Sequence, residues 1–287
     1  MGYTRVAEPR SGATVWINGA RQERPNLPAA GCPFCPGGVE APDDYDVRCF
    51  PNRWPALPDD RCEVILYTPR HDAAFWELGV AGVRRVVDLW AERTASLGAR
   101  SDVLCVLPFE NRGAEVGATI SHPHGQLYAL DEVPPVLRAE LLPALAPTCP
   151  VCAGVSNGHP VASAGGWEAV IPAAAKYPFE LLIAPARHLP DLPSLGAADR
   201  DAMAAVLVDA LARLDRLFDA PMPYMLWVHQ RPTDGGDWPL AHVHVEVAPL
   251  YRAPGTPRYV AAAELATGVW LNPVEPSDAA HRLRELT

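Results

Sequence analysis

The apolar positions of the chain follow two periodicities, and each of them occurs in two places. Residues 72–97 and 197–218 carry apolar side chains at three- and four-residue spacing, which predicts two amphipathic helices. Short apolar runs bounded by Gly, Pro or Asp lie around each helix and predict buried strands. These strands are Cys62–Thr68, Val103–Phe109, Gly125–Leu130, Glu168–Ile171, Phe179–Ala184, Tyr224–His229 and His242–Ala248. Strands outnumber helices and are joined by short turns or by one helix, so we predict an α+β fold on a mostly antiparallel sheet.

The same set of motifs occurs in both halves of the chain, in the same order and at nearly the same sequence offset. Each half has a Cys-x-x-Cys pair, a histidine that follows an apolar strand, and a His-x-His motif. The first set is Cys32, Cys35, His71, His122 and His124, and the second is Cys149, Cys152, His188, His242 and His244. Chance rarely repeats such a series, so we predict a duplicated unit. The two domains are expected in residues 1–147 and 148–287.

The composition restricts the class of protein. Of the 287 residues, 49% are apolar and 20% are charged, which is typical of a globular protein with one large or two medium cores. The sequence has no run of about eighteen apolar residues and no basic leader before an apolar one, so we expect no membrane association and a cytoplasmic location. The net charge of −10 argues against non-specific binding to nucleic acid. An anionic substrate would need a local cluster of basic groups.

The cysteines indicate metal binding rather than disulfides. Their number, seven, is odd, and a cytoplasmic protein rarely uses a disulfide framework. Closed zinc sites take four thiolate or imidazole ligands, and the duplication indicates which histidines complete each cysteine pair. The predicted zinc sites are Cys32, Cys35, His71 and His122 in the first unit, and Cys149, Cys152, His188 and His242 in the second. A redox pair would explain neither the paired histidines nor their repetition, whereas a second site that has lost its metal stays an alternative.

The most distinctive stretch is His122-Pro-His124-Gly-Gln126, which follows a glycine-containing loop. On a strand these three polar side chains would share one face at steps of about 7 Å. With zinc on His122, the next imidazole could act as a nucleophile or base beside backbone N–H groups that bind anions. The second unit has His244 and Glu246 at these places, and an acid suits a metal or charge network better than a phosphate pocket. We therefore expect one chemical centre, at His124; a surface loop that happens to hold two histidines is the alternative.

These residues resemble a known family. His122-Pro-His124-Gly-Gln126, preceded by Phe109-Glu-Asn-Arg-Gly113, is similar to the galactose-1-phosphate uridylyltransferase family of the histidine-triad superfamily. The similarity extends over almost the whole chain, through Arg21–Pro25, Cys32–Cys35, Pro51–Pro55, Tyr177–Glu180 and Ala241–His244. The resemblance implies tandem histidine-triad-like domains, mostly antiparallel sheet with flanking helices, and a homodimer.

The resemblance also implies an activity, a ping-pong transfer of UMP from UDP-glucose to galactose 1-phosphate. His124 would form the uridylyl-histidine, because imidazole is a competent nucleophile at neutral pH. Gln126 stands where histidine-triad hydrolases have a further histidine; a carboxamide donates hydrogen bonds to phosphate but cannot pass a proton to water. In family terms, Asn52 and Asn111 would contact the nucleotide, Thr119 and Ser121 the phosphates, and Arg21 and Arg24 would supply positive charge. In the segment that closes over the sugar phosphate, Glu264 is available for sugar hydroxyls.

The sequence departs from the family pattern in two places. Some family members hold an iron-type metal, and the matching residues here are Glu140, His229, His242 and His244. The second cysteine pair competes for His242, and the duplication favours the cysteine-containing set. A lysine-and-glycine pattern is usual where this chain has Arg258 and Ala262, which leaves the identity of the sugar 1-phosphate open. Arginine could still bind a phosphate in bidentate fashion.

Two other functions are compatible with parts of the pattern. A histidine-triad hydrolase or phosphorylase would use His124 and pass the nucleotide to water or phosphate; release of free UMP would indicate hydrolysis. A non-enzymatic zinc-binding module would bind zinc and form no covalent nucleotide. The acidic balance and the lack of a basic stripe with aromatic residues make nucleic acid an unexpected partner for such a module.

Overall fold

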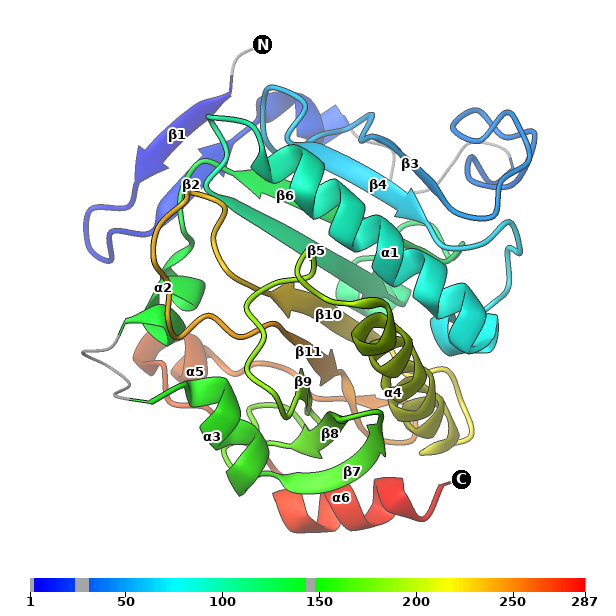
Figure 1. Ribbon diagram of the computed structural model, residues 1–287, viewed down its shortest axis with the longest axis vertical. Helices are drawn as coiled ribbons and strands as arrows, with labels where there is room; N and C mark the ends of the chain where they lie inside the picture. Colours follow the sequence, from blue (N-terminus) through cyan, green and yellow to red (C-terminus); the bar gives the residue numbers. More distant parts are fainter. Residues whose placement is uncertain (1–2, 24–30, 143–147, 287) are drawn as a thin grey trace.

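A computed structural model describes residues 3–23, 31–142 and 148–286 of the protein (Figure 1). Its centre is a nine-stranded sheet with the strand order β3-β4-β6-β5-β10-β11-β9-β8-β7, in which all neighbours are antiparallel. The strands are β3 (Arg48–Pro51), β4 (Cys62–Leu66), β5 (Cys105–Arg112), β6 (His124–Leu130), β7 (His159–Ala164), β8 (Trp167–Ile171), β9 (Leu181–Pro185), β10 (Tyr224–His229) and β11 (His244–Pro249). The predicted α+β class and antiparallel sheet are confirmed.

The strand order reflects the duplication. The first unit contributes β3-β4-β6-β5, and the second contributes the equivalent strands β8-β9-β11-β10 in reverse order, with β7 added at the edge. The two units meet where β5 pairs with β10, and Phe109 lies opposite Trp227. An approximate two-fold axis through this pair relates the halves, which therefore share one continuous sheet. The expected domain limits at 147 and 148 stay a prediction, because residues 143–147 lie outside the described part.

Three helices cover one face of the sheet: α1 (Gly79–Gly98), α4 (Ala197–Arg216) and α6 (Pro276–Arg284) (Figure 1). The helices α1 and α4 come from equivalent places in the two units and pack against each other. Their inward faces, together with alternate residues of the strands, form one large core that includes Trp90 and Trp167. Burial of this apolar stripe explains why the helical periodicity located both helices.

The first predicted helix begins later than the sequence pattern suggests. Residues Phe75–Leu78 form a short 3₁₀ helix, η2, and the α-helix starts only at Gly79. Gly79, where η2 ends and α1 begins, has a φ of +64°, outside the right-handed helical region, so the backbone changes direction between the two helices. Periodicity could not reveal this break, because Phe75 is buried in the same core as the helix that follows.

The other face of the sheet carries smaller elements. Helix α2 (Pro135–Leu141) packs near the start of β5, and α3 (Pro150–Asn157) packs on β8 and β9. A loop with Phe34 and Ala41 packs against β4. Each of these three clusters is small and separate from the large core, so this face leaves room for polar side chains.

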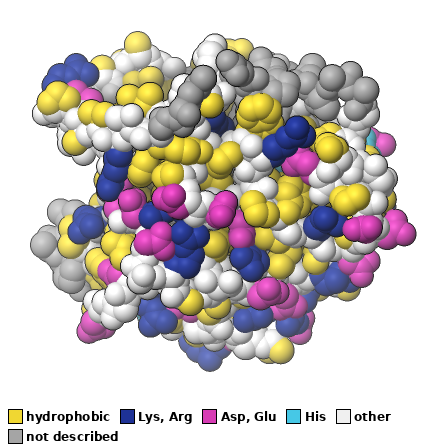
Figure 2. All heavy atoms as spheres, turned by 90° about the horizontal axis from the view of Figure 1, so that it is seen from above, with side chains coloured by type: hydrophobic (Ala, Val, Ile, Leu, Met, Phe, Trp, Pro, Cys, Tyr) yellow, Lys and Arg dark blue, Asp and Glu magenta, His cyan; other side chains and the backbone are white. Residues whose placement is uncertain are grey.

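The remaining described elements lie at the ends of the sheet and in its connections. They are β1 (Thr4–Ala7), β2 (Thr14–Ile17), η1 (Gly19–Glu23), η3 (Ala114–Val116), β12 (Tyr251–Ala253), β13 (Thr256–Pro257) and α5 (Ala262–Thr267). On the face seen in Figure 2, acidic and basic side chains lie next to one another with apolar side chains between them. Within the described ranges, no helix is both long and apolar enough to cross a bilayer.

Candidate active site and metal centres

Strand β6 carries the predicted chemical centre. Its buried residues Leu127 and Ala129 face α1 and belong to the large core, so the alternating His124 and Gln126 face the opposite side. The strand lies between β4 and β5, and Gln126 pairs with Phe109. A small cavity beside His124 is lined by residues that include Asn111 and Ser121.

The backbone fixes the tautomer of His124. Its Nδ1 lies 2.8 Å from the carbonyl oxygen of His122, and a carbonyl can only accept, so Nδ1 carries the proton. The lone pair is then on Nε2. The ring also packs against Phe34, with 5.0 Å between the centroids. A half-buried imidazole held in this way is suited to nucleophilic attack through Nε2.

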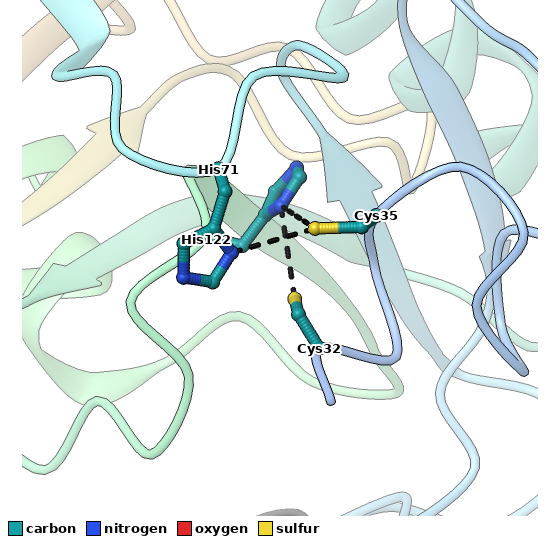
Figure 3. Close-up of side chains that lie close together, drawn as sticks. All are labelled: Cys32, Cys35, His71 and His122. Carbon is teal, nitrogen blue, oxygen red and sulfur yellow. Dashed lines mark hydrogen bonds between the residues drawn. The ribbon is translucent and has the colours of Figure 1, made fainter. Parts of the chain in front are cut away.

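The predicted first zinc ligands meet at one point, beside the start of β6 (Figure 3). The Nδ1 atom of His122 lies 3.7 Å from Sγ of Cys32 and 3.6 Å from Sγ of Cys35, and Nδ1 of His71 lies 3.5 Å from Sγ of Cys35. Tetrahedral zinc with normal bond lengths separates sulfur and nitrogen ligands by about 3.6 Å. The four residues therefore have the spacing that a zinc ion requires.

Hydrogen bonds orient His122 for this role. Its Nε2 donates to the carbonyl oxygen of Thr68 at 2.7 Å, and the hydroxyl of Tyr45 lies 2.9 Å from the same nitrogen. This leaves Nδ1 to bind a metal. Burial lowers the pKa of His122, so the ring stays neutral at neutral pH, which is the form that binds metal. Burial and the neighbouring Cys32 raise the pKa of Cys35, and a cation would offset this effect.

The second predicted zinc group is also assembled. The Nδ1 atom of His242 lies 3.5 Å from Sγ of Cys149 and 3.3 Å from Sγ of Cys152, and Nδ1 of His188 lies 3.7 Å from Sγ of Cys152. The Nε2 atom of His242 donates to the carbonyl oxygen of Pro185 at 3.0 Å, as His122 does to Thr68 in the first unit. Burial lowers the pKa of His242 to about 4, so it too is neutral.

A third group of side chains that could hold a metal ion lies next to the second. It consists of Glu140, His229, His244 and Glu246, whose ligand atoms all lie within 4.8 Å of one another. Glu140 comes from α2, and its Oε1 is 3.1 Å from Nδ1 of His229. The Nε2 atom of His244 lies 3.7 Å from Oε2 of Glu140 and 3.6 Å from Oε1 of Glu246. Glu246, rather than His242, is the fourth member of this group, and His242 lies with the cysteines.

The third group occupies the place that the two-fold axis makes equivalent to His124. His244 and Glu246 on β11 correspond to His124 and Gln126 on β6. His229 lies opposite His244, just as Asn111 would lie opposite His124 when the β5–β6 register is continued. Burial is outweighed by nearby Glu246 and Glu140, so the pKa of His244 is raised. The sequence-based expectation of a charge or metal network here agrees with this arrangement.

Comparison with known proteins adds to this geometry. The profile of the galactose-1-phosphate uridyl transferase N-terminal domain matches residues 52–134, and that of the C-terminal domain matches residues 157–286. Galactose-1-phosphate uridylyltransferase of Thermotoga maritima is 32% identical, over 96% of both chains. The enzyme of that name from Streptomyces lividans is 36% identical, over 90% of this chain and 80% of the relative.

This chain belongs to the galactose-1-phosphate uridylyltransferase family. A solved structure described as uridylyltransferase superposes with a TM-score of 0.90 at 29% identity, and covers 99% of this chain and 98% of that one. The recognition made from the sequence motifs is confirmed, and so is the enzyme class that these names carry.

The structure brings only some of the family's expected substrate residues to His124. Asn52 follows β3 and donates through Nδ2 to Oε1 of Gln126 at 3.1 Å. Asn111 and Ser121 line the cavity beside His124, and the Ser121 hydroxyl lies 3.3 Å from Nε2 of His71. Thr119 belongs to the same half-buried loop. The substrate roles of these residues stay predictions.

The arginines and Glu264 are placed differently. Arg258 is buried and forms an ion pair with Glu264, and its guanidinium lies over the rings of Tyr177 (4.9 Å) and Trp270 (5.5 Å). Neither partner lines the cavity beside His124. Arg21 lies in η1, half-buried, and Arg24 lies outside the described residues. To bind a sugar phosphate, Arg258 and Glu264 would have to separate from each other, or they would have to contact a substrate held by a partner chain.

Two residues near the family site were not singled out as functional from the sequence. Tyr45 contacts His122 from a loop with no recognisable pattern, so no sequence signal indicated it. Glu110 belongs to the family motif around Asn111 but is completely buried on the helix-covered side of β5. Tyr224 donates to it at 3.1 Å, and burial raises its pKa to about 7. The available signal was the alternation of the strand, because Glu110 continues the series of buried positions Val106 and Pro108.

Proposed function

We propose that this protein transfers UMP from UDP-glucose to galactose 1-phosphate, with His124 as the covalent nucleophile. The observation that carries this proposal is the hydrogen bond from Nδ1 of His124 to the carbonyl oxygen of His122, at 2.8 Å. It prepares Nε2 as the attacking atom on the polar face of the sheet. Family membership supports the same reaction, because the relatives at 32% and 36% identity are named galactose-1-phosphate uridylyltransferase.

The reaction then has two balanced steps. In the first, Nε2 of His124 attacks the α-phosphorus of UDP-glucose, a P–N bond forms, and the bond to the bridging oxygen breaks as glucose 1-phosphate leaves. In the second, a phosphate oxygen of galactose 1-phosphate attacks the same phosphorus. The P–N bond breaks, its electron pair returns to Nε2, and UDP-galactose is released. Gln126 donates hydrogen bonds to the phosphoryl oxygens and provides no proton shuttle that would activate water.

We propose that the two cysteine-containing groups bind zinc. Their sulfur–nitrogen distances of 3.3–3.7 Å fit tetrahedral coordination, and thiolate with imidazole is a zinc-selective ligand set. Zinc at the first group would hold the His122 ring in place, and the His122 carbonyl in turn orients His124. The third group, with two imidazoles and two carboxylates, suits a divalent ion such as iron or manganese.

Metal analysis of the purified protein tests this assignment. We expect about two zinc ions per chain, and about one in either Cys35→Ser or Cys152→Ser. The Cys35→Ser variant should also form the histidine adduct at least about 10-fold more slowly. Loss of a metal ligand or of a residue that orients one typically lowers metal affinity or activity by about 10–100-fold. Equal zinc content in the wild type and both variants would contradict the proposed ligands.

We also propose that the protein is a cytoplasmic homodimer, as the family resemblance implies. The segment between β13 and α6 exposes several large apolar side chains, of which the most exposed are Tyr259, Leu265, Val269 and Leu271. A segment with so many exposed apolar side chains is typical of a surface that another chain covers. The molar mass in solution, from light scattering coupled to gel filtration, would decide between monomer and dimer.

The transfer reaction is tested by the mass of the intact protein. After incubation with UDP-glucose we expect one uridylyl adduct per chain, mapped to His124 by peptide analysis, and its loss when galactose 1-phosphate is added. The His124→Gly variant should keep its fold and form no adduct. An adduct that galactose 1-phosphate does not discharge would point to another sugar 1-phosphate. Absence of an adduct in the metal-loaded wild type, with release of UMP, would instead indicate a hydrolase.

A further inference from the structure

Two hydrogen bonds connect the backbone near β3 to Gln126. The backbone N–H of Trp54 donates to Oδ1 of Asn52 at 2.8 Å, and Nδ2 of Asn52 donates to Oε1 of Gln126 at 3.1 Å. Asn52 itself is fixed to the sheet, because its backbone N–H donates to the carbonyl oxygen of Cys62 at 2.8 Å. A backbone N–H can only donate, so it determines which end of Asn52 carries the oxygen. The NH₂ of Asn52 in turn selects the oxygen of Gln126.

We propose that Asn52 is a positioning residue that sets the orientation of the Gln126 carboxamide. With its oxygen held by Asn52, Gln126 presents its NH₂ to the phosphoryl group transferred to His124. The opposite orientation would place a carbonyl oxygen against negatively charged phosphoryl oxygens. This role rests on the proposed transfer reaction, and it differs from the nucleotide contact that the family resemblance implies for Asn52.

The second unit supplies an internal comparison. Glu246 replaces Gln126 there and accepts a hydrogen bond from Nε1 of Trp227 at 3.1 Å. Both oxygens of a carboxylate accept, so Glu246 has no orientation to be chosen. The residue that follows β8, the counterpart of β3, is Pro172, which has no side-chain donor. The orienting amide is thus present only in the unit that has an amide to orient.

Single-turnover transfer from UDP-glucose to His124, measured in the metal-loaded protein, tests this role. Asp at position 52 can only accept at neutral pH, so Asn52→Asp would select the NH₂ of Gln126 and turn its oxygen toward the phosphate. We expect the maximal rate to fall about 100-fold, as for Gln126→Ala, because one lost transition-state donor costs 10²–10³. Asn52→Ala only leaves the Gln126 amide free to rotate, so the maximal rate should fall by less than about 10-fold. The UDP-glucose concentration that gives the half-maximal rate should be nearly unchanged.

A double-mutant cycle separates orientation from charge repulsion. In the Gln126→Ala background, Asn52→Asp should slow transfer by less than about 2-fold, because no amide remains to be turned. The matched control is Asn111→Asp, which adds the same charge on neighbouring β5 and should keep its full effect in that background.

The proposal for Asn52 is overturned if the effects of Asn52→Asp and Gln126→Ala multiply. It is also overturned if the Asn52 variants weaken binding of UDP-glucose while the maximal rate is unchanged, which is the result of a direct nucleotide contact. Both results leave the transfer reaction intact, since the wild type still forms its adduct. A wild type that forms no adduct overturns the transfer reaction itself, and the role of Asn52 with it.

Discussion

At the scale of single residues, the site depends on which atoms carry protons. The backbone carbonyls of His122 and His242 accept from Nδ1 of His124 and His244, both at 2.8 Å, so the two-fold-related histidines have the same tautomer. Their surroundings then differ. The neutral amide of Gln126 lies on the same strand face as His124, whereas the carboxylates of Glu140 and Glu246 lie within 3.7 Å of His244. One position is therefore suited to attack an anionic phosphate, and the other to hold a cation.

The buried acid Glu110 gives a prediction for pH dependence. Burial raises its pKa from 4.5 to about 7, so between these values the folded protein keeps a proton that the unfolded chain has lost. Stability from this group is therefore highest below pH 4.5 and falls as the pH rises toward 7. Glu110→Gln removes this dependence. The difference in unfolding free energy between variant and wild type should grow by about 3 kcal/mol from acid to neutral pH.

Urea denaturation of both proteins at several pH values measures this difference. Tyr224→Phe serves as a control, because it removes the hydrogen bond to Glu110 and leaves the titrating carboxyl in place. Parallel stability curves for the wild type and Glu110→Gln would contradict the raised pKa.

At the scale of elements, Tyr67 packs against strand β6 and fixes its position. The backbone N–H of Tyr67 donates to the carbonyl oxygen of Pro123 at 3.2 Å, between the two histidines. A Cβ atom placed on Gly125 would lie 2.1 Å from the Tyr67 hydroxyl. Glycine is required at this position because strand β6 and the tyrosine approach so closely.

Gly125→Ala is therefore expected to lower stability by about 1–3 kcal/mol, the usual cost of overpacking a core. It should also slow uridylyl transfer, because the strand that carries both His124 and Gln126 must shift. Thermal unfolding and adduct formation measure the two effects. Adding Tyr67→Phe to the Gly125→Ala variant removes the closest atom and should restore part of both; no recovery would show that this contact is not the cause.

At the scale of the whole molecule, charged and hydrogen-bonded contacts connect the two units beside the seam between β5 and β10. Arg112 at the end of β5 forms a bidentate ion pair with Asp215 of α4, at 2.6 and 2.9 Å. Asp215 also accepts from Nε1 of Trp76 at 2.7 Å, so the first unit contacts it twice. The side chains of Arg112 and Asp215 are only 20% and 12% exposed. Removing one partner of such a pair lowers stability more than replacing both, because the remaining charge stays buried and unpaired.

Arg112→Met leaves a nearly buried carboxylate without its main partner, so we expect a loss of about 3 kcal/mol. Because one sheet spans both units, urea unfolding should stay a single transition in both the wild type and the variant. The double variant Arg112→Met/Asp215→Asn should be less destabilised than the sum of the single changes. Two separate transitions in the wild type would show that the units fold independently.

The sequence determined the local elements and the membership of the two groups of cysteine and histidine. Apolar periodicity is a local property, and it located the helices α1 and α4 and the central strands. The repeated spacing of cysteines and histidines indicated two groups that the structure assembles as expected. This worked because a duplicated fold must bring corresponding residues to corresponding places.

Only the tertiary structure decided how residues distant in the chain meet. Glu140 of α2 joins His229, His244 and Glu246 because antiparallel pairing of β10 with β11 brings two of these strand positions face to face. Arg258, whose substrate role stays a prediction, pairs with Glu264 and lies over the ring of Tyr177, which is distant in the chain. Asn52 meets Gln126 across β4. The sequence fixes which side chains are available, but the register of the sheet determines their partners, and hydrogen-bond partners decide which of them act.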